Sequence, residues 1–418
     1  MAHFPSDRRI VITGMGVVTP LGWEVEEFWR RILAGECGID RITAFDPSGF
    51  DSQIAGEVKG FDPSPAFPSP KELRRTDRFC QFAVYAAWKA IKDAGLEPDR
   101  LDLDRIGVYI GSGIGGLATT CQQHLVLLER GPSKMSPYTI PMLISNIASG
   151  LVAIYHNFRG PNYATCSACA TSAHAVGEAW RVIKMADADV MVAGGAEATI
   201  IPIGLGGFCA LRALSTRNDD PKHASRPFDA ERDGFVMSEG AGVVVLEELE
   251  HARRRGAKIY CEVVGYGATA DAYHVTAPEP EGRGAARCMR IALERAGIRP
   301  EEVDYINAHG TSTPLGDVAE TKAIKSVFGE HAYKLMVSSI KGAVGHLLGA
   351  AGVVELIATA LTVKTGAVPP TINLEKPDPE CDLDYVPNTA RQANVRIAIN
   401  NSFGFGGQNA CIVVKKFE

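Results

Sequence analysis

Several common sequence features are absent from these 418 residues. Apart from Cys166 and Cys169, the ten cysteines form no CxxC pair, and none has zinc-knuckle spacing, so we interpret them as free thiols of a reducing compartment. The net charge of −6 argues against nucleic acid or an anionic membrane as a general partner. The first nine residues contain no apolar segment of the secretory kind, so we expect a cytoplasmic protein.

The sequence also lacks an apolar run that is both long and uncharged. The most membrane-like stretch, residues 346–363, is short and rich in Ala and Gly, and it contains Glu355. We therefore expect a buried core helix there and no membrane span. Hydrophobic content of 46% and charged content of 22% are those of a soluble globular protein, whose core needs no metal or disulfide for stability.

Apolar strands alternate with helical patterns along the whole chain, which indicates an α/β fold with largely parallel sheets. The rhythm of residues 1–257 is similar to that of residues 258–418, and each part ends on an apolar strand. We therefore predict two similar halves that arose by internal duplication.

The boundaries of individual elements follow from hydrophobic periodicity. We predict continuous helices over residues 71–94 and 140–155, a strand over 189–193 with a turn at 194–197, and a loop over 400–409.

Cys169 lies between an extended polar segment and an Ala-rich stretch with helical spacing. This places the thiol at a helix N-terminus, where unpaired N–H groups and the helix dipole favour an anion. We expect a lowered thiol pKa and hence a nucleophile. The alternative is a small apolar core residue, since free cysteine is often buried.

Three segments of the C-terminal half each follow a predicted strand and carry reactive or Gly-rich residues. They contain His309, Lys341 with His346, and Phe403 with Phe405. Strand ends of such sheets carry functional residues, so one shared site is expected. The histidines would supply donors for a developing oxyanion or enolate. The alternatives are that the two histidines belong to the core, that the lysine is a surface charge, and that the last segment is a turn with a core phenylalanine. The histidines are not interpreted as a metal site, because no third ligand lies at metal spacing.

The segment Gly111–Gly116 matches GxGxxG after a predicted strand. A dinucleotide site would also need an acidic residue at the end of the next strand, and none stands in that context. A tight backbone turn beside a substrate channel is the better interpretation.

Several of these segments strongly resemble the β-ketoacyl-[acyl-carrier-protein] synthases. The resemblance runs nearly end to end and is closest to the elongating type II enzymes. It is carried by Ser-Ala-Cys169-Ala, Asn307-Ala-His309-Gly-Thr-Ser-Thr-Pro, Lys341-Gly-Ala-Val-Gly-His346 and Asn-Ser-Phe403-Gly-Phe405-Gly-Gly. Further matching segments begin at Arg212, Ser225, Arg232 and Asp271.

The resemblance implies a thiolase-like fold, with two halves stacked as an α-β-α-β-α sandwich, and a homodimer. It implies a decarboxylating condensation of acyl-[acyl carrier protein] with malonyl-[acyl carrier protein], as in fatty acid elongation. Cys169 would carry the acyl group, His309 and His346 would stabilise the enolate, and Lys341 would support their field. The N–H groups of Cys169 and Phe405 would form the oxyanion hole, with Phe403 and Phe405 as a gate.

The resemblance also bears on ligands. Thr311 and Thr313 would contact the phosphopantetheine arm, which arrives on the carrier protein, so no resident cofactor is expected. Ile114 would limit the depth of the acyl pocket. Whether a monovalent cation binds near Asn307, Glu355 and Asn400 stays open. Because carriers of this kind are acidic, we predict a basic patch at the tunnel mouth; its residues are Lys71, Arg74, Arg75, Lys134 and Arg212.

Three related functions remain as alternatives. A thiolase would use a second cysteine as the acid, and none stands beside either histidine or in the Phe403–Gln408 segment. A non-catalytic partner subunit would lack the nucleophile, whereas Cys169 is present. The third, a type II polyketide ketosynthase, would have the same residues. A module that only binds a ligand is a poor alternative, because it would not need so many reactive groups.

Overall fold

The computed structural model describes residues 8–418, and the first seven residues, on which part of the signal-peptide expectation rests, lie outside the described part. Ten strands form one sheet in the order β10-β9-β13-β14-β8-β1-β7-β6-β4-β5. The strands of the N-terminal half are β1 (Ile10–Val18), β4 (Ile106–Gly111), β5 (Asn162–Tyr163), β6 (Val190–Glu197) and β7 (Gly240–Glu248). Those of the C-terminal half are β8 (Cys261–Ala270), β9 (Tyr305–Asn307), β10 (Met336–Ser338), β13 (Ile397–Gly404) and β14 (Gln408–Lys415).

When the strands are counted outward from the centre of the sheet, each strand on one side has a counterpart at the same position on the other side. The sequence β1-β7-β6-β4-β5 is matched by β8-β14-β13-β9-β10, and only two residue pairs join β1 to β8. The two predicted halves therefore have matching topologies. The boundary between residues 257 and 258 stays a prediction.

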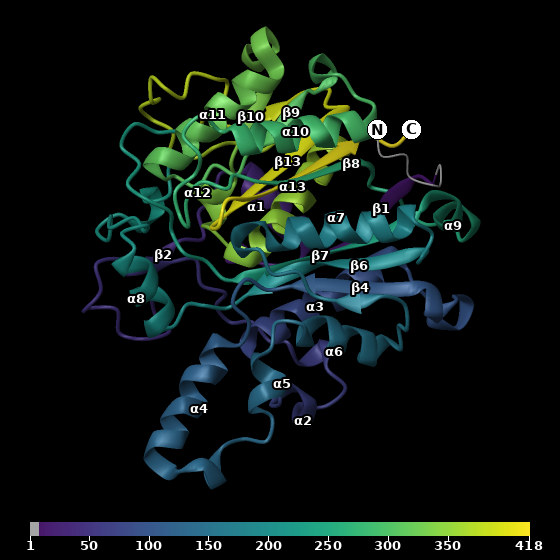
Figure 1. Cartoon of the computed structure of the whole chain (residues 1–418), viewed down its shortest axis with the longest axis vertical. Coiled ribbons are helices and arrows are strands. Elements are labelled where there is room, and N and C mark those ends of the chain that lie inside the picture. The colour runs from purple at the N-terminus through teal and green to yellow at the C-terminus, as the bar shows by residue number, and fades with distance from the viewer. Residues whose placement is uncertain (1–7) are drawn as a thin grey trace.

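The helices lie in three layers around these two half-sheets (Figure 1). The outer helix α3 (Arg78–Ala94) packs on β1 and β7, and α6 (Ile147–His156) packs on β4. The central helices α7 (Thr171–Lys184) and α13 (Ala351–Thr365) lie between the half-sheets. On the far side, α10 (Arg283–Ala296) covers β8 and β14, with α11 (Pro314–Phe328) beside it. The predicted thiolase-like α-β-α-β-α fold is confirmed.

The remaining elements are short or lie at the edges. The remaining helices are α1 (Val25–Leu33), α2 (Pro70–Leu73), α4 (Leu117–Arg130), α5 (Thr139–Leu143), α8 (Pro202–Ala210), α9 (Leu249–Arg254) and α12 (Lys341–Val344). Two small ribbons are formed by β2 (Asp40–Arg41) with β3 (Ile54–Ala55) and by β11 (Ala367–Val368) with β12 (Arg391–Gln392).

Paired glycines let the outer helices approach the two central strands. A Cβ atom on Gly16 of β1 would lie 2.1 Å from the carbonyl oxygen of Ala86 on α3. A Cβ atom on Gly267 of β8 would lie 2.1 Å from the carbonyl oxygen of Cys288 on α10. The same small-residue packing thus recurs in both halves, which is a second sign of duplication.

The sheet is mixed and not largely parallel as predicted. β4, β5 and β6 are parallel, as are β9, β10 and β13, but the five pairings from β6 through β7, β1, β8 and β14 to β13 are antiparallel. The reason lies in the connections: β13 and β14 form a hairpin, and the long segment after β6 carries the chain back before β7 begins. Only strands joined by helical crossovers are held parallel.

Two helices predicted as continuous are broken. The predicted helix 71–94 is interrupted before α3, where the Asp77 carboxylate accepts hydrogen bonds from the backbone of Phe79 and from Thr119. Such a side chain caps a new helix N-terminus. The predicted helix 140–155 is broken between α5 and α6, where the Leu143 carbonyl accepts from the Gly116 amide.

Two predicted loops belong to strands. The predicted turn at 194–197 is part of β6, which pairs with β7 as far as Glu197. The predicted loop 400–409 is mostly β13 and β14, joined by a turn at 405–407.

The apolar stretch predicted as a core helix is α13 with the short 3₁₀ turn before it. By length and composition alone, residues 348–365 are the one helical stretch within residues 8–418 that could cross a membrane, but 89% of it is buried in the protein. Val354 and Ile357 pack in the same cluster as Val176 and Trp180 of α7. The stretch is a core helix, as predicted.

Candidate active site

Cys169, His309, His346, Phe403 and Phe405 line one cavity of about 390 Å³. They come from four places in the fold: the turn before α7, the end of β9, the segment after α12, and the β13–β14 hairpin. Residues more than 230 positions apart are therefore placed together by the sheet order (Figure 1).

Cys169 lies in a strained turn at the start of α7. The preceding residue, Ala168, has a left-handed backbone with φ of 49°, which is uncommon for a residue with a side chain. The hairpin backbone approaches so closely that a Cβ atom on Gly404 would lie 3.1 Å from the Cys169 nitrogen. The Phe405 backbone N–H lies near enough to the Cys169 sulfur to favour its thiolate form and so to act against the rise in the pKa of Cys169.

The predicted lowering of the Cys169 pKa is not what the site produces. Burial raises the pKa of this thiol to about 12, although the charge on Lys341 and the Phe405 N–H oppose the rise. The side chain is only 9% exposed, so loss of solvation outweighs its position at the helix N-terminus. The resting nucleophile is a neutral thiol.

His309 is fixed through its backbone and through Nδ1. The Glu320 carboxylate accepts from the backbone N–H of His309 at 2.9 Å and from that of Gly310 at 2.8 Å. The Lys341 ammonium lies 3.5 Å from His309 Nδ1. An ammonium can only donate, so Nδ1 is the acceptor and the proton of the neutral ring is on Nε2.

His346 stands at nearly a right angle to His309. The ring centroids are 5.4 Å apart with an interplanar angle of 84°, and His346 is 2% exposed. Burial first, and then the Lys341 charge, hold the pKa of both imidazoles well below the ordinary value. Both rings are therefore neutral near pH 7 and donate N–H bonds without gaining or losing a proton.

Lys341 is buried and paired with Glu355 of α13. Burial raises the pKa of Glu355 to about 7, while Lys341 opposes the rise. One oxygen of this carboxylate bonds Lys341; the other, Oε2, has no hydrogen-bond partner among residues 8–418. The pair places a buried positive group beside His309.

Two asparagines next to Glu355 also present unpaired oxygens. Asn307 of β9 and Asn400 of β13 are register partners, and their amide groups donate to the α13 carbonyls of Glu355 at 3.4 Å and Gly352 at 2.9 Å. The Oδ1 atoms of both are buried without a partner in the described chain. Carbonyl and carboxylate oxygens are the ligands that hard cations prefer, so these three residues fit the monovalent cation that the sequence left open. No group of three or more His, Cys, Asp or Glu side chains within residues 8–418 could hold a metal ion.

Thr311 and Thr313 line the cavity near its mouth, with their hydroxyl oxygens 3.0 Å apart. Arg232 holds this segment from behind, because its guanidinium donates to the carbonyls of Thr313 at 3.1 Å and Pro314 at 2.8 Å. Arg232 in turn pairs with Asp378 at 2.7 Å.

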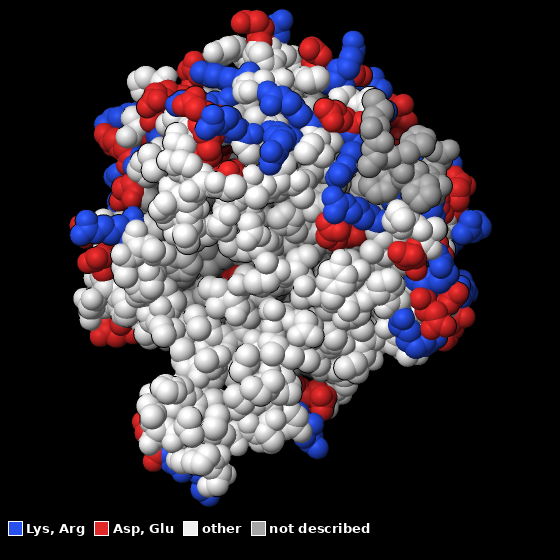
Figure 2. Space-filling model, in the orientation of Figure 1, with Lys and Arg blue, Asp and Glu red and all other residues white. Residues whose placement is uncertain are grey.

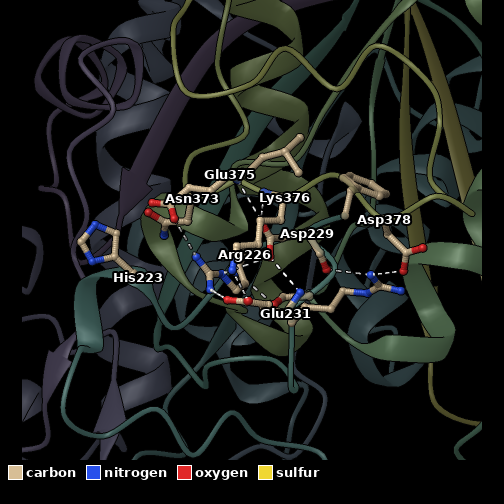
Figure 3. Close-up of polar contacts among 12 residues, drawn as sticks. His223, Arg226, Asp229, Glu231, Asn373, Glu375, Lys376 and Asp378 are labelled. Carbon is tan, nitrogen blue, oxygen red and sulfur yellow. Dashed lines mark hydrogen bonds and ion pairs between the residues drawn. The ribbon is translucent and has the colours of Figure 1, made fainter.

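A charged network, drawn in Figure 3, supports the same segment. Asp229 accepts from the backbone of Glu375 and Lys376, and the Arg226 guanidinium lies between Glu231 and Glu375 at 3.5 and 3.7 Å. The Arg226 backbone N–H donates to Ser312. The segments Ser225–Asp229 and Arg232–Phe235 thus brace the two threonines.

Ile114 does not lie on the cavity wall as predicted. It is 44% exposed on the turn between β4 and α4 and is not among the residues that line the cavity of this chain, so its role in limiting the acyl pocket stays a prediction. Leu348, which follows His346, lies on the wall instead.

The five predicted carrier-binding residues come from three separate parts of the chain, and the patch that they would form stays a prediction. Arg212 lines the cavity just after α8. Lys71, Arg74 and Arg75 belong to α2 and the turn after it, and Lys134 follows α4. In Figure 1, α4 lies between α8 and α2. Arg75 is also engaged within the chain, by Glu72 at 3.1 Å and by the Tyr138 ring at 4.3 Å.

Glu320 and Arg232 support the site, although local sequence patterns predict no role for either; Arg232 only begins a segment that carries the family resemblance. Each acts on a backbone segment contributed by another part of the chain, so local periodicity could not reveal the contact. The one signal that could have been used is an acid on the buried face of a helix, as at Glu320 in α11, where Asp317 and Thr321 are buried as well.

Comparison with known proteins agrees with this geometry. The family descriptions "Beta-ketoacyl synthase, N-terminal domain" and "Beta-ketoacyl synthase, C-terminal domain" match residues 7–252 and 260–375. The 3-oxoacyl-[acyl-carrier-protein] synthase 2 of Synechocystis is 53% identical over 98% of this chain and 99% of that protein, and that of Coxiella burnetii is equally similar over the same shares. A solved type II polyketide ketosynthase, in complex with its acyl carrier protein, aligns with a TM-score of 0.92 at 36% identity, covering 99% of this chain and all of that one.

Proposed function

The chain belongs to the β-ketoacyl synthase family, and from this premise we propose that it elongates fatty acids. The reaction is the decarboxylating condensation of an acyl-[acyl carrier protein] with malonyl-[acyl carrier protein], which gives 3-oxoacyl-[acyl carrier protein]. The observation that carries the assignment is the single cavity lined by Cys169, His309 and His346, with the Phe405 N–H at the sulfur.

Acyl transfer comes first. The Cys169 sulfur attacks the carbonyl of the incoming thioester, the carrier thiol leaves, and an acyl-cysteine remains. Because the resting thiol is neutral, its proton must leave during the attack and reach the departing carrier thiolate. His346 is the imidazole of the cavity that can relay it, since Nδ1 of His309 accepts from Lys341 and Nε2 of His309 carries a proton. The backbone N–H groups of Cys169 and Phe405 meet the oxyanion, each worth about 3–4 kcal/mol.

Condensation follows in the same cavity. Malonyl-carrier loses CO₂, and the N–H groups of His309 and His346 meet the enolate oxygen that forms. The enolate carbon attacks the acyl carbonyl and the C–S bond to Cys169 breaks. Cys169 leaves as the thiolate and takes up a proton from water, which regenerates the thiol. Neutral donors suit this step, since they stabilise the charge without having to exchange a proton.

Lys341 and Glu355 act on the histidines. The Lys341 ammonium fixes the Nδ1 acceptor of His309 and adds positive field near the enolate. Asn307, Glu355 and Asn400 are the residues that would hold a monovalent cation, whose contribution is a fixed charge behind the histidine pair.

The carrier protein is the partner that brings both substrates. Thr311 and Thr313, which line the cavity and are held by Arg232, would contact the phosphopantetheine arm. The carrier itself meets Arg212 at the mouth, and α2 and Lys134 contribute through a second subunit. No resident cofactor is needed, and free thiols with no disulfide framework suit the cytoplasm.

A homodimer is supported by an uncharged face on one side of the chain. Figure 2 shows almost no charged residues over the region of α5 and α6. Leu128, Ile140, Ile154 and Tyr163 are 45–71% exposed there, and β5 ends the sheet with an open edge. Such patches and edges mark protein interfaces. Ile154→Asp should give a monomer by analytical ultracentrifugation, and a dimer of unchanged stability would exclude this face.

The elongation proposal is tested by mass spectrometry of the intact enzyme after incubation with acyl-carrier proteins of differing chain length. We expect an acyl adduct on Cys169 and, after malonyl-carrier is added, a 3-oxoacyl product longer by two carbons. An enzyme that forms no adduct with any acyl-carrier would overturn the proposal.

A type II polyketide ketosynthase is the second candidate, because one such enzyme has the same fold. The higher identity to 3-oxoacyl-[acyl-carrier-protein] synthases favours fatty acid elongation. Repeated malonyl additions that leave several keto groups on one product would favour the polyketide function.

A further inference from the structure

Glu197 is a fully buried carboxylate that none of the roles above uses. It is the last residue of β6 and accepts four hydrogen bonds. The donors are all uncharged: the Ser112 hydroxyl at 2.8 Å and the backbone N–H groups of Gly113 at 2.9 Å, Ile114 at 3.2 Å and Gly349 at 3.1 Å. Burying a carboxylate without a cationic partner costs free energy, so we expect its hydrogen bonds to have a structural role.

These donors come from two separate segments. Three belong to the Gly111–Gly116 turn of the N-terminal half, and one belongs to the 3₁₀ turn Leu348–Ala350 of the C-terminal half. Leu348 is in a left-handed conformation, with φ of 51°, and lies on the cavity wall with Cys169. Glu197 therefore joins the two halves at the cavity wall.

The two glycine segments pack so closely around the Glu197 carboxylate that neither Gly113 nor Gly349 could carry a side chain. A Cβ atom on Gly113 would lie 2.7 Å from Glu197 Oε2, and one on Gly349 would lie 2.6 Å from the same oxygen. A Cβ atom on Gly349 would also lie 2.6 Å from the Gly113 nitrogen. The two glycine segments thus lie directly on each other over the carboxylate.

The same carboxylate faces the nucleophile. Its negative charge adds to the rise that burial causes in the pKa of Cys169 and in that of Cys166. These two thiols are the titratable groups that interact with it, since the two glycine segments contribute backbone amides and the Ser112 hydroxyl. Burial raises the pKa of Glu197 itself to about 7, although its hydrogen bonds oppose the rise.

We propose that Glu197 is a positioning residue for chain length: its carboxylate holds the Gly111–Gly116 turn against the Leu348–Ala350 turn and so fixes the cavity wall beside Cys169. The inference rests on the proposed condensation. When the carboxylate loses acceptor capacity, Leu348 is free to move, and the room for the acyl chain changes.

The test compares Glu197→Gln with the parent enzyme on acyl-carrier substrates from short to long. Glutamine has the same shape, but its NH₂ would face backbone donors. We expect the ratio of kcat/KM for long over short chains to change about tenfold, as for one or two methylenes in a pocket. CO₂ release from malonyl-carrier without an acyl donor should stay within about twofold, since that step rests on the histidines.

A pH series separates positioning from general loss of stability. In the parent, the long-over-short ratio should change around pH 7, because the carboxyl is protonated below that pH and loses acceptor capacity. In Glu197→Gln the ratio should not depend on pH in this range. Ser112→Ala removes one donor from the carboxylate and should shift the ratio in the same direction by a smaller factor.

Glu247→Gln is the matched control. Glu247 is a buried carboxylate on β7, at the opposite end of the β6–β7 pair, where it bonds Arg255 and Thr13. Its removal should lower stability and leave the chain-length ratio alone. An unchanged ratio in Glu197→Gln, or equal changes in both variants, would overturn the proposal. A parent enzyme that makes no 3-oxoacyl product would refute the proposed function instead.

Discussion

At the scale of single residues, the site depends on groups kept neutral by burial. Cys169, His309 and His346 are each at most 9% exposed, and burial is the largest cause of the pKa shift in all three. The charges needed for catalysis therefore appear only during the reaction. Preorganised donors then meet them in a site with little water, where electrostatic interactions are strongest.

The raised pKa of Cys169 predicts a distinctive pH dependence. The rate of alkylation by iodoacetamide should rise about tenfold for each pH unit from 7 to 10, because the thiolate fraction rises in proportion. Mass spectrometry in a Cys166→Ser background reports Cys169 alone, since Cys166 is an exposed thiol on the same peptide. A rate that levels off below pH 8 would show that the helix N-terminus, and not burial, governs this thiol.

The reactive residues of the site could be predicted from the sequence, whereas the residues that position them could not. Cys169, His309, Lys341 and His346 stand at strand or helix ends, where local pattern is informative. Glu197 acts through contacts with segments more than 80 and 150 positions away, which no local pattern encodes.

At the scale of elements, glycines set the distance between sheet and helix. The α3 helix lies so close to β1 that a Cβ atom on Gly16 would overlap the Ala86 carbonyl oxygen. Neither backbone can move without disturbing the sheet or the helix hydrogen bonds. The short distance between helix and sheet follows from the GxG segments in β1 and β8. Their role could not be predicted from the sequence, because it depends on which helix packs on each strand.

We predict that Gly16→Ala lowers the free energy of unfolding by about 3 kcal/mol or more, at the upper end for overpacked cores. Gly267→Ala, at the corresponding place on β8, should cost a similar amount. Gly49→Ala is the control, because nothing lies within 4 Å of a Cβ atom there. Urea unfolding measures all three, and equal stabilities would contradict the close packing.

The basic residues around α2 lead to a second prediction at this scale. Arg74 is exposed, whereas Arg75 is engaged by Glu72 and Tyr138. Charge reversal at Arg74 should therefore raise KM for carrier-bound substrate about fivefold at low salt, with a smaller effect at Arg75. The effect should fade as salt is added.

Two controls accompany this measurement. Arg100→Glu changes a side chain that is 80% exposed on another surface and should leave KM unchanged. Pantetheine thioesters without carrier should show no difference among the variants. If Arg74→Glu has the parent's KM at low salt, α2 does not contact the carrier.

At the scale of the whole molecule, duplication explains how distant residues meet. The two half-sheets have matching strand orders, and the central helices α7 and α13 begin beside Cys169 and a few residues after His346. The rhythm of the sequence was enough to predict two similar halves. It could not reveal the antiparallel centre of the sheet, because strand direction depends on the path of long connections and not on strand composition.

The central claim is that the halves divide the chemistry: Cys169 holds the acyl group, while His309 and His346 drive decarboxylation. Replacing Cys169 with Gln puts an amide carbonyl about where the acyl carbonyl sits, within reach of the Phe405 N–H. The most direct measurement is therefore CO₂ and acetyl-carrier formation from malonyl-carrier without an acyl donor.

The account predicts that Cys169→Gln cannot condense but releases CO₂ at least as fast as the parent enzyme. Adding His346→Ala should reduce that release by about 10²-fold or more, because the enolate loses a preorganised donor. Folding and carrier binding of each variant are checked in parallel. A folded, carrier-binding Cys169→Gln enzyme that releases no CO₂ would show that Cys169 takes part in decarboxylation directly and would contradict this division of roles.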